Sequence, residues 1–199
     1  GNTTGNYNTV SGWGGLSSNT TGSSNSAFGY QALTANTTAS ENTAVGYQAS
    51  YTNTTGTANV SLGYQALLAS TTGSFNTALG RRALYSNTTA SNNTAVGFKA
   101  GNSNTTGTAN VSLGYIAGED NTTGINNVYL GSSTGKTNTT ASQNTFVGSA
   151  AGETTTGGDN TFIGYAAGWK ISSATKNTIL GKYNGNQESL DIRTSSNNI

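Results

Sequence analysis

A short phrase of alternating polar and small or apolar residues, seen as Asn42–Tyr47, returns at a fixed interval along the chain. Each copy is marked by its glycine, and nine of the ten intervals between successive marker glycines are 17 residues long, while one is 16. A fixed period predicts a repeat architecture in which each copy is one structural unit. We place the residue missing from the short interval between Gly148 and Thr154. The marker glycines are Gly12, Gly29, Gly46, Gly63, Gly80, Gly97, Gly114, Gly131, Gly148, Gly164 and Gly181.

Two columns of the repeat carry most of the pattern. The fourth residue before the glycine is always Asn, which predicts a buried or half-buried ladder of amides bonded from copy to copy. The residue directly before the glycine is large and apolar in every copy except that of Ser11, and we predict that it fills the core. The asparagines are Asn8, Asn25, Asn42, Asn59, Asn76, Asn93, Asn110, Asn127, Asn144, Asn160 and Asn177. The predicted core residues are Phe28, Val45, Leu62, Leu79, Val96, Leu113, Leu130, Val147, Ile163 and Leu180.

The alternation within the phrase predicts a short strand. Its Thr, Val and Tyr are expected on one face and its Asn, Ala and Gly on the other. Seventeen residues are too few for a pair of helices, so we predict an all-β fold, a parallel β-solenoid or β-roll of eleven 17-residue coils in residues 1–183. Residues 184–199 depart from the repeat and are expected to form a junction to a following domain. The marker glycine indicates either a positive φ or the close approach of a neighbouring backbone.

A single coil has a thin interior, which predicts self-association. One large apolar residue per coil, at about 25 cal/mol per Å² of buried surface, offers little against the ordering entropy of a whole coil. Two residues before the glycine the column is small in the early copies, as at Ala44 and Ser61, and aromatic in later ones, as at Phe146. Such a face would admit a partner chain closely. We therefore predict a parallel homotrimer built on this thin face.

Composition narrows the chemistry. Charged residues make up 8% of the chain, the net charge is +1, and Cys, His and Met are absent. This excludes disulfides and enzymes that depend on Cys or His. The carboxylates are scattered, without the recurring pair that a glycosidase needs, and the adjacent Glu119 and Asp120 are a weak signal for calcium. We predict no enzymatic activity, no cofactor, no metal site, no nucleic-acid partner and no membrane insertion.

At this point the phrases resemble a known group of proteins. Asn42–Ala49 and Asn93–Ala100 resemble repeats in bacteriophage tail-fibre and appendage proteins, often those that end in an intramolecular chaperone domain. They are also similar in pattern to the shorter head repeats of trimeric autotransporter adhesins. The resemblance covers residues 1–183. It implies a homotrimer that joins other virion tail or fibre proteins, takes part in host attachment and lies in the virion.

Three functions fit these features. The first is a fibre shaft that sets reach and stiffness. The second is an adhesive module, on a fibre or at the bacterial cell surface, that binds host surface polysaccharide by stacking aromatic side chains on sugar rings. The third is an ice-binding solenoid that presents its threonine columns. The residues with which the second function would contact glycans are Tyr30, Tyr47, Tyr64, Arg81, Arg82 and Tyr115.

The return leg of the repeat carries a second phrase, Asn-Thr-Thr, that matches the acceptor pattern for N-glycosylation. Because the phrase is locked to the repeat, we interpret it as a ladder of turns and not as a set of modification sites. Its asparagines are Asn2, Asn19, Asn36, Asn53, Asn87, Asn104, Asn121 and Asn138.

Overall fold

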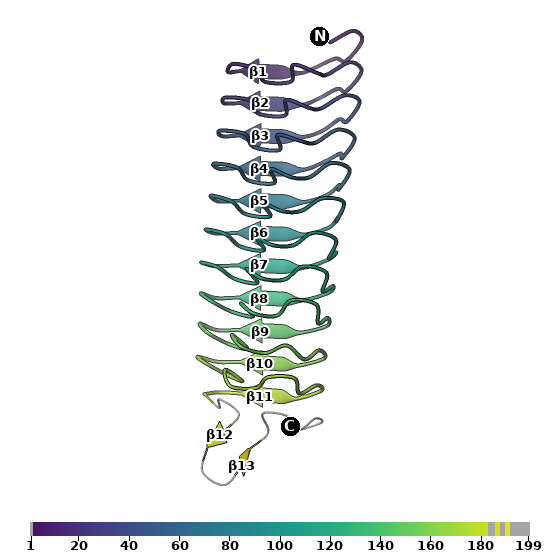
Figure 1. Cartoon of the computed structure of the whole chain (residues 1–199). Coiled ribbons are helices and arrows are strands. Elements are labelled where there is room, and N and C mark those ends of the chain that lie inside the picture. Colours follow the sequence, from purple (N-terminus) through teal and green to yellow (C-terminus); the bar gives the residue numbers. More distant parts are fainter. Residues whose placement is uncertain (1, 183–185, 188–189, 192–199) are drawn as a thin grey trace.

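The computed structural model describes residues 2–182, 186–187 and 190–191, and its coils are stacked into a single rod (Figure 1). Each coil contributes one three-residue strand, and the eleven strands form one parallel sheet in chain order. The predicted all-β parallel solenoid is therefore confirmed. The strands are β1 Thr9–Ser11, β2 Ser26–Phe28, β3 Thr43–Val45, β4 Val60–Leu62, β5 Thr77–Leu79, β6 Thr94–Val96, β7 Val111–Leu113, β8 Val128–Leu130, β9 Thr145–Val147, β10 Thr161–Ile163 and β11 Thr178–Leu180.

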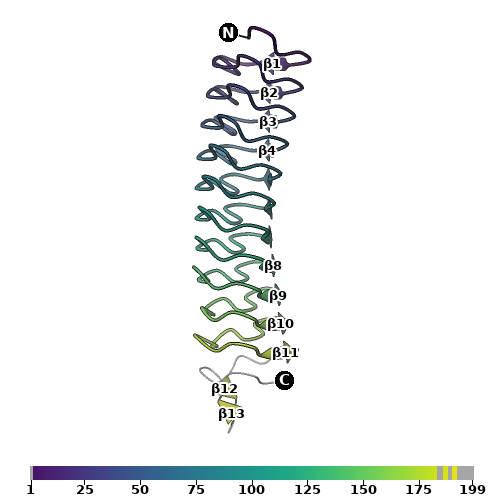
Figure 2. The same ribbon diagram turned by 90° about the vertical axis from the view of Figure 1, so that its right-hand side faces the viewer.

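The strands lie along one side of the rod and the turns along the other (Figure 2). Neighbouring strands pair with a step of one repeat, so that Ala44 lies beside Ser61 and Val45 beside Leu62. Equivalent side chains consequently pile up along the rod axis. Every column of the sequence repeat is a file of side chains in the structure.

The one short coil loses its residue in a turn. The Thr156 amide donates to the Ser172 carbonyl, and these two residues stand at the same distance after their own marker glycines. The Asp159 amide donates to the Ser142 carbonyl, and both residues keep the spacing to their following marker glycines that Gln143 and Ile125 have in the intact coil before. The missing residue therefore lies between Thr156 and Asp159. The predicted position, within residues 149–153, is wrong, because the tight turn after the strand is kept intact and the return leg absorbs the deletion.

Both predicted reasons for the marker glycine, a positive φ and the close approach of a neighbouring backbone, hold in the structure. Gly46 has a φ of +136°, and a β-carbon on it would stand 2.5 Å from the carbonyl oxygen of Gly63 in the next coil. A side chain at this corner would meet backbone, which has no room to move. Each strand therefore ends at its glycine, and the chain turns there.

The predicted core column is wrong. The side chains directly before the glycine point out of the rod: Leu62 is 49% exposed and Leu180 is 74% exposed, and Val45 is only half-buried. The interior is instead filled by the thin face, where Ala44 and Ala78 are fully buried. If every coil pointed one of these large side chains inward, the interior would be overfilled, because two asparagine columns already occupy it. The ten outward residues are Phe28, Val45, Leu62, Leu79, Val96, Leu113, Leu130, Val147, Ile163 and Leu180.

The true core combines three columns that lie two residues before, three after and four after the glycine. In the early coils small residues meet a leucine, as where Ala27 and Ala32 pack with Leu33. In the late coils the order is inverted, because aromatic rings on the strand pack over glycine. The thin face is thus covered within one chain, and the predicted use of that face for a partner chain is wrong as well.

Beyond the solenoid, β12 Asn186–Gln187 and β13 Leu190–Asp191 pair antiparallel. The predicted junction, residues 184–199, otherwise lies outside the described residues. The solenoid sheet ends with β11.

Candidate functional surface

The first asparagine column forms the predicted ladder. The Asn42 amide N–H donates to Asn25 Oδ1 at 3.0 Å, and the Asn59 amide N–H donates to Asn42 Oδ1 at 3.0 Å. Most of the side-chain amides also reach across the coil, as where Asn59 Nδ2 donates to the Gly73 carbonyl at 2.9 Å. These side chains are buried from Asn25 to Asn177. The column therefore ties strand to return leg and coil to coil, and its role is structural.

The Asn-Thr-Thr phrase forms a second ladder, which confirms its interpretation as a turn. Asn36 Nδ2 donates to Asn19 Oδ1 at 2.8 Å and to the Ala39 carbonyl at 3.0 Å, and both asparagines are buried. All the phrase asparagines except Asn2 are buried in this way. A buried side-chain amide is not accessible to a glycosylating enzyme.

The first threonine of most phrases donates its hydroxyl along the axis, whereas the second threonine, as at Thr55 and Thr106, is exposed. Thr54 Oγ1 donates to the Thr71 carbonyl at 2.9 Å, and Thr105 Oγ1 donates to the Thr122 carbonyl at 3.0 Å. A flat array of hydroxyls that bind ordered water would need these protons to point outward. The geometry therefore disfavours the column of first threonines as an ice-binding surface.

An aromatic column follows the marker glycine and lies on the outside of the rod. The rings of Trp13, Tyr30, Tyr47 and Tyr64 are stacked nearly parallel, with centroids 5.1 to 5.2 Å apart. The Arg81 guanidinium continues the stack, 5.5 Å from the ring of Tyr64 on one side and equally far from the next ring on the other. The stack then ends in the pair Phe98 and Tyr115, 5.4 Å apart.

This stacking changes what the predicted glycan-contact residues offer. Tyr30, Tyr47 and Tyr64 each lie between two neighbours, so both faces of every ring are covered. Arg81 is held between rings, and Arg82 donates its Nε–H to Gln65 Oε1 at 3.1 Å. Of the six residues, Tyr115 alone keeps a ring face uncovered by a described ring or cation.

A file of long polar side chains runs beside the aromatic column. Gln48 Nε2 donates to Gln31 Oε1 at 3.0 Å, and Gln65 Nε2 donates to Gln48 Oε1 at 3.1 Å. Arg82 takes the next place in this file and caps the amide chain with its guanidinium. The file is half-buried and its hydrogen bonds run along the axis, so it adds stiffness.

The outward strand face is the most apolar surface of the rod. Its apolar side chains are those directly before the glycine, such as Leu62 at 49% exposed, while the column two residues earlier is Val at Val60, Val111 and Val128 and Thr or Ser in the other copies. Because the column continues through the stacked strands, the apolar strip is roughly 50 Å long. Contiguous exposed apolar strips of this extent mark interaction surfaces in soluble proteins.

Charged groups gather on a few coils only. Lys99 Nζ lies 3.0 Å from Glu119 Oε1. Burial, followed by the neighbouring Glu119, raises the pKa of the Asp120 carboxyl. In the described part of the chain, Asp and Glu side chains nowhere form a group of three or more that could hold a metal ion. Within the same residues, no helix is both long enough and apolar enough to span a bilayer.

The fold defines the chain as a β-solenoid repeat protein. Searches of protein-family models, of curated proteins and of solved structures found no match to it. The features that sequence reasoning missed are the outward orientation of the apolar column and the covered faces of the aromatic column. The outward orientation follows from strand parity, which the alternation within the repeat contains, whereas the covered ring faces follow from stacking geometry, which the repeat does not reveal.

Proposed function

We propose that the chain is the shaft of a homotrimeric bacteriophage tail fibre, or of a similar host-attachment appendage, and that it has no enzymatic activity. The observation that carries the proposal is the unbroken axial register of strands β1 to β11. Sheet, asparagine ladders, threonine file and aromatic stack all run parallel to the rod axis. Bending the rod sideways must therefore stretch hydrogen bonds in several coils at once, which makes it suited to hold a fixed reach.

The outward strand face supports self-association. A three-fold axis parallel to the rod would bring three such apolar strips together, each in the same register as its partners. Another copy of this chain has the same axial spacing of apolar side chains, so its ridges match those of the strip. With a net charge of +1, the chains repel one another little.

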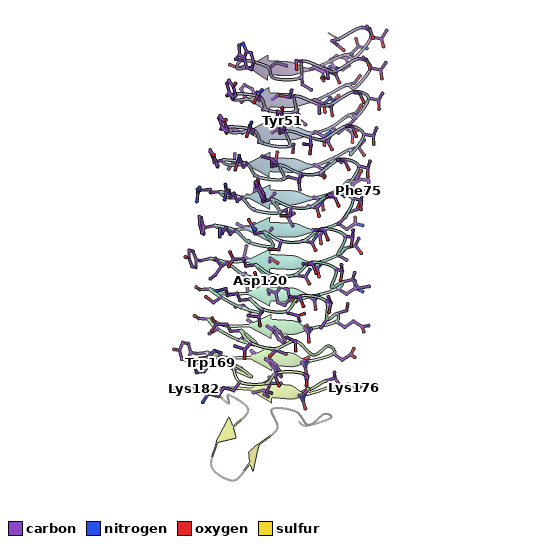
Figure 3. The ribbon with its side chains drawn as sticks, viewed as in Figure 1. Tyr51, Phe75, Asp120, Trp169, Lys176 and Lys182 are labelled. Atoms are coloured by element: carbon purple, nitrogen blue, oxygen red, sulfur yellow. The ribbon has the colours of Figure 1, made fainter. Side chains whose placement is uncertain are left out.

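The oligomeric state tests this part of the proposal. We expect sedimentation equilibrium at micromolar concentration to give the mass of three chains. The paired substitution of Leu62→Asp and Leu113→Asp should yield folded monomers, because it places charges in the centre of the strip. Phe75→Asp is the matched control, since Phe75 is 62% exposed at the edge of the rod away from the aromatic column (Figure 3). A wild-type monomer, or a control that dissociates equally, would contradict the assembly.

The location of the rod tests whether the chain belongs to a bacteriophage tail fibre. Antibodies against the chain, imaged by immunogold electron microscopy, should label thin fibres attached to virions. Labelling of bacterial cell surfaces would instead favour the trimeric-adhesin alternative, and labelling of neither would reject both locations.

The adhesive alternative has one observation in its favour, which is the row of exposed aromatic side chains. A glycan array on the purified chain tests it, since an adhesive module must bind glycans of the host surface, whereas the shaft function itself requires no such binding. The ice-binding alternative is tested by thermal hysteresis, and we expect none, because the first threonine of most return legs already donates its hydroxyl to backbone, which leaves one exposed threonine column there and not a flat array of several.

A further inference from the structure

The aromatic column is interrupted at one place along the rod. Tyr115 and Tyr165 belong to this column, and the two coils between them carry Ser132 and Ser149 at the same position. Both serines are exposed. Three coil steps of about 4.8 Å each separate the two tyrosines by roughly 14 Å. We call these four residues the column break.

Each tyrosine that borders the column break has one covered face and one free face. The ring of Phe98 stacks on Tyr115 from the N-terminal side, at 5.4 Å, and the Lys182 ammonium lies over Tyr165 from the C-terminal side, at 5.6 Å. Among the described residues no ring or cation covers the opposite faces. Tyr115 is accordingly 56% exposed and Tyr165 63%, against 42% for the sandwiched Tyr47. The free faces of Tyr115 and Tyr165 are therefore directed toward each other, with the two serines between them.

We propose that the column break is a binding site for a neutral saccharide. The C–H faces of pyranose rings pack against tyrosine faces, and sugar hydroxyls exchange hydrogen bonds with the serine hydroxyls, which both donate and accept. The four residues carry no charge, which favours a neutral sugar over an acidic one. Arg81 shows that this column accommodates a flat group between two rings, since its guanidinium lies 5.5 Å from the ring on either side.

The proposal moves the saccharide site away from most of the residues that the sequence suggested. Tyr30, Tyr47 and Tyr64 cannot stack on a sugar while their neighbours cover both of their faces. The site also goes beyond the shaft function and does not depend on it. A monomeric chain or a chain from a cell surface would present the same column break.

The test begins with a glycan array that carries neutral and acidic oligosaccharides, followed by titration of neutral tetraoses of glucose and N-acetylglucosamine against the full chain. We expect saturable binding to at least one neutral oligosaccharide. Tyr115→Ala and Tyr165→Ala should each weaken it about threefold to tenfold, the range expected from loss of one aromatic stacking partner. Absence of saturable binding to every neutral oligosaccharide, or a preference for acidic ones, would overturn the proposal.

A filled variant gives the sharper result. Ser132→Tyr combined with Ser149→Tyr completes the aromatic stack and should abolish saccharide binding while the melting temperature is kept or raised. Arg81→Tyr is the matched control, because it adds a tyrosine to the same column outside the break and should leave affinity unchanged. Binding that survives in the filled variant, or that is lost equally in the control, would place the ligand elsewhere and refute the site.

Discussion

The ring of Phe146 lies directly over Gly152 in the core of the rod, so that a β-carbon on the glycine would stand 2.4 Å from the ring. Phe162 has the same relationship with Gly168. Early coils reverse the sizes: Ala78 on the strand packs with Leu84 in the turn. The coil interior thus has a fixed volume. Where the strand residue two before the marker glycine is large, the turn residue four after it is small, and the reverse holds in the early coils.

Gly152→Ala should therefore destabilise the rod by about 3 kcal/mol, of which roughly 2 arise from overpacking against Phe146 and about 1 from a side chain at positive φ. Gly101→Ala is the control, because Gly101 has a φ of +56°, almost that of Gly152, but its β-carbon would meet only the end of Leu84, at 3.1 Å. We expect it to cost about 1 kcal/mol. Denaturant unfolding of both variants measures the difference, and equal losses would contradict the fixed volume of the interior.

The fold was predictable because its signal is periodic. A parallel stack of coils is indicated by the 17-residue interval, the short alternating phrases and the unvarying Asn column. This inference does not depend on which side chains point inward. The predicted inner face is wrong because side-chain size is a poor guide to burial in so thin a coil. Strand parity gives the right answer, since Asn42 and Ala44 share a face, so that a buried amide column commits the small residues to the interior. The opposite sizes of Phe146 and Gly152 carry the same information within the sequence.

The candidate surface was less accessible from sequence. An aromatic column is visible at Tyr30 and Tyr47, but its repeat does not say whether the rings present faces or edges to solvent. Only the stacked geometry shows that neighbouring rings cover their faces. The column break was equally visible as two serines, and its meaning depends on which ring faces the stack leaves free.

The second asparagine ladder is interrupted at Ser70, and this predicts a stabilising substitution. Asn53 Oδ1 and Ser70 Oγ are buried there without a hydrogen-bond partner in the structure. Ser70→Asn should place an amide that donates to Asn53 Oδ1 and accepts from Asn87, raising the free energy of unfolding by about 1 kcal/mol. Ser18→Asn, at an exposed position, should change stability little. Thermal and denaturant melts compare the two, and a destabilised Ser70→Asn variant would refute the ladder argument.

Arg81 gives a prediction about the aromatic stack. Its guanidinium bridges Tyr64 and Phe98, so Arg81→Ala should lose about 1 kcal/mol, from two exposed cation–π contacts. Arg81→Tyr should restore or exceed wild-type stability because it completes the stack. Arg81→Lys should fall between them, since an ammonium lacks the flat shape that fits between two rings. If all three variants have the melting temperature of the wild type, the stack contributes nothing to the stability of the rod.

Tyr129 predicts a dependence of stability on alkaline pH. Its hydroxyl is fully buried with no hydrogen-bond partner, and burial raises the pKa of Tyr129 far above its ordinary value of 10.0. The native state therefore keeps this proton at a pH where the unfolded chain releases it. Stability from this group is complete below about pH 10 and is lost above it, by about 1.4 kcal/mol for each pH unit.

Tyr129→Phe should consequently behave differently from the wild type in two ways. At pH 7 it should be more stable by about 1 kcal/mol, because an unpaired buried hydroxyl is removed while the ring still packs over Gly135. Between pH 10 and 11.5 it should lose less stability than the wild type, since one alkaline titration has been eliminated. Gly101→Ala is the control, because it lowers stability without removing a titratable group and should leave the alkaline slope unchanged. Urea unfolding across this pH range decides the matter: parallel curves for wild type and Tyr129→Phe would mean that the buried hydroxyl ionises as freely in the rod as in the unfolded chain.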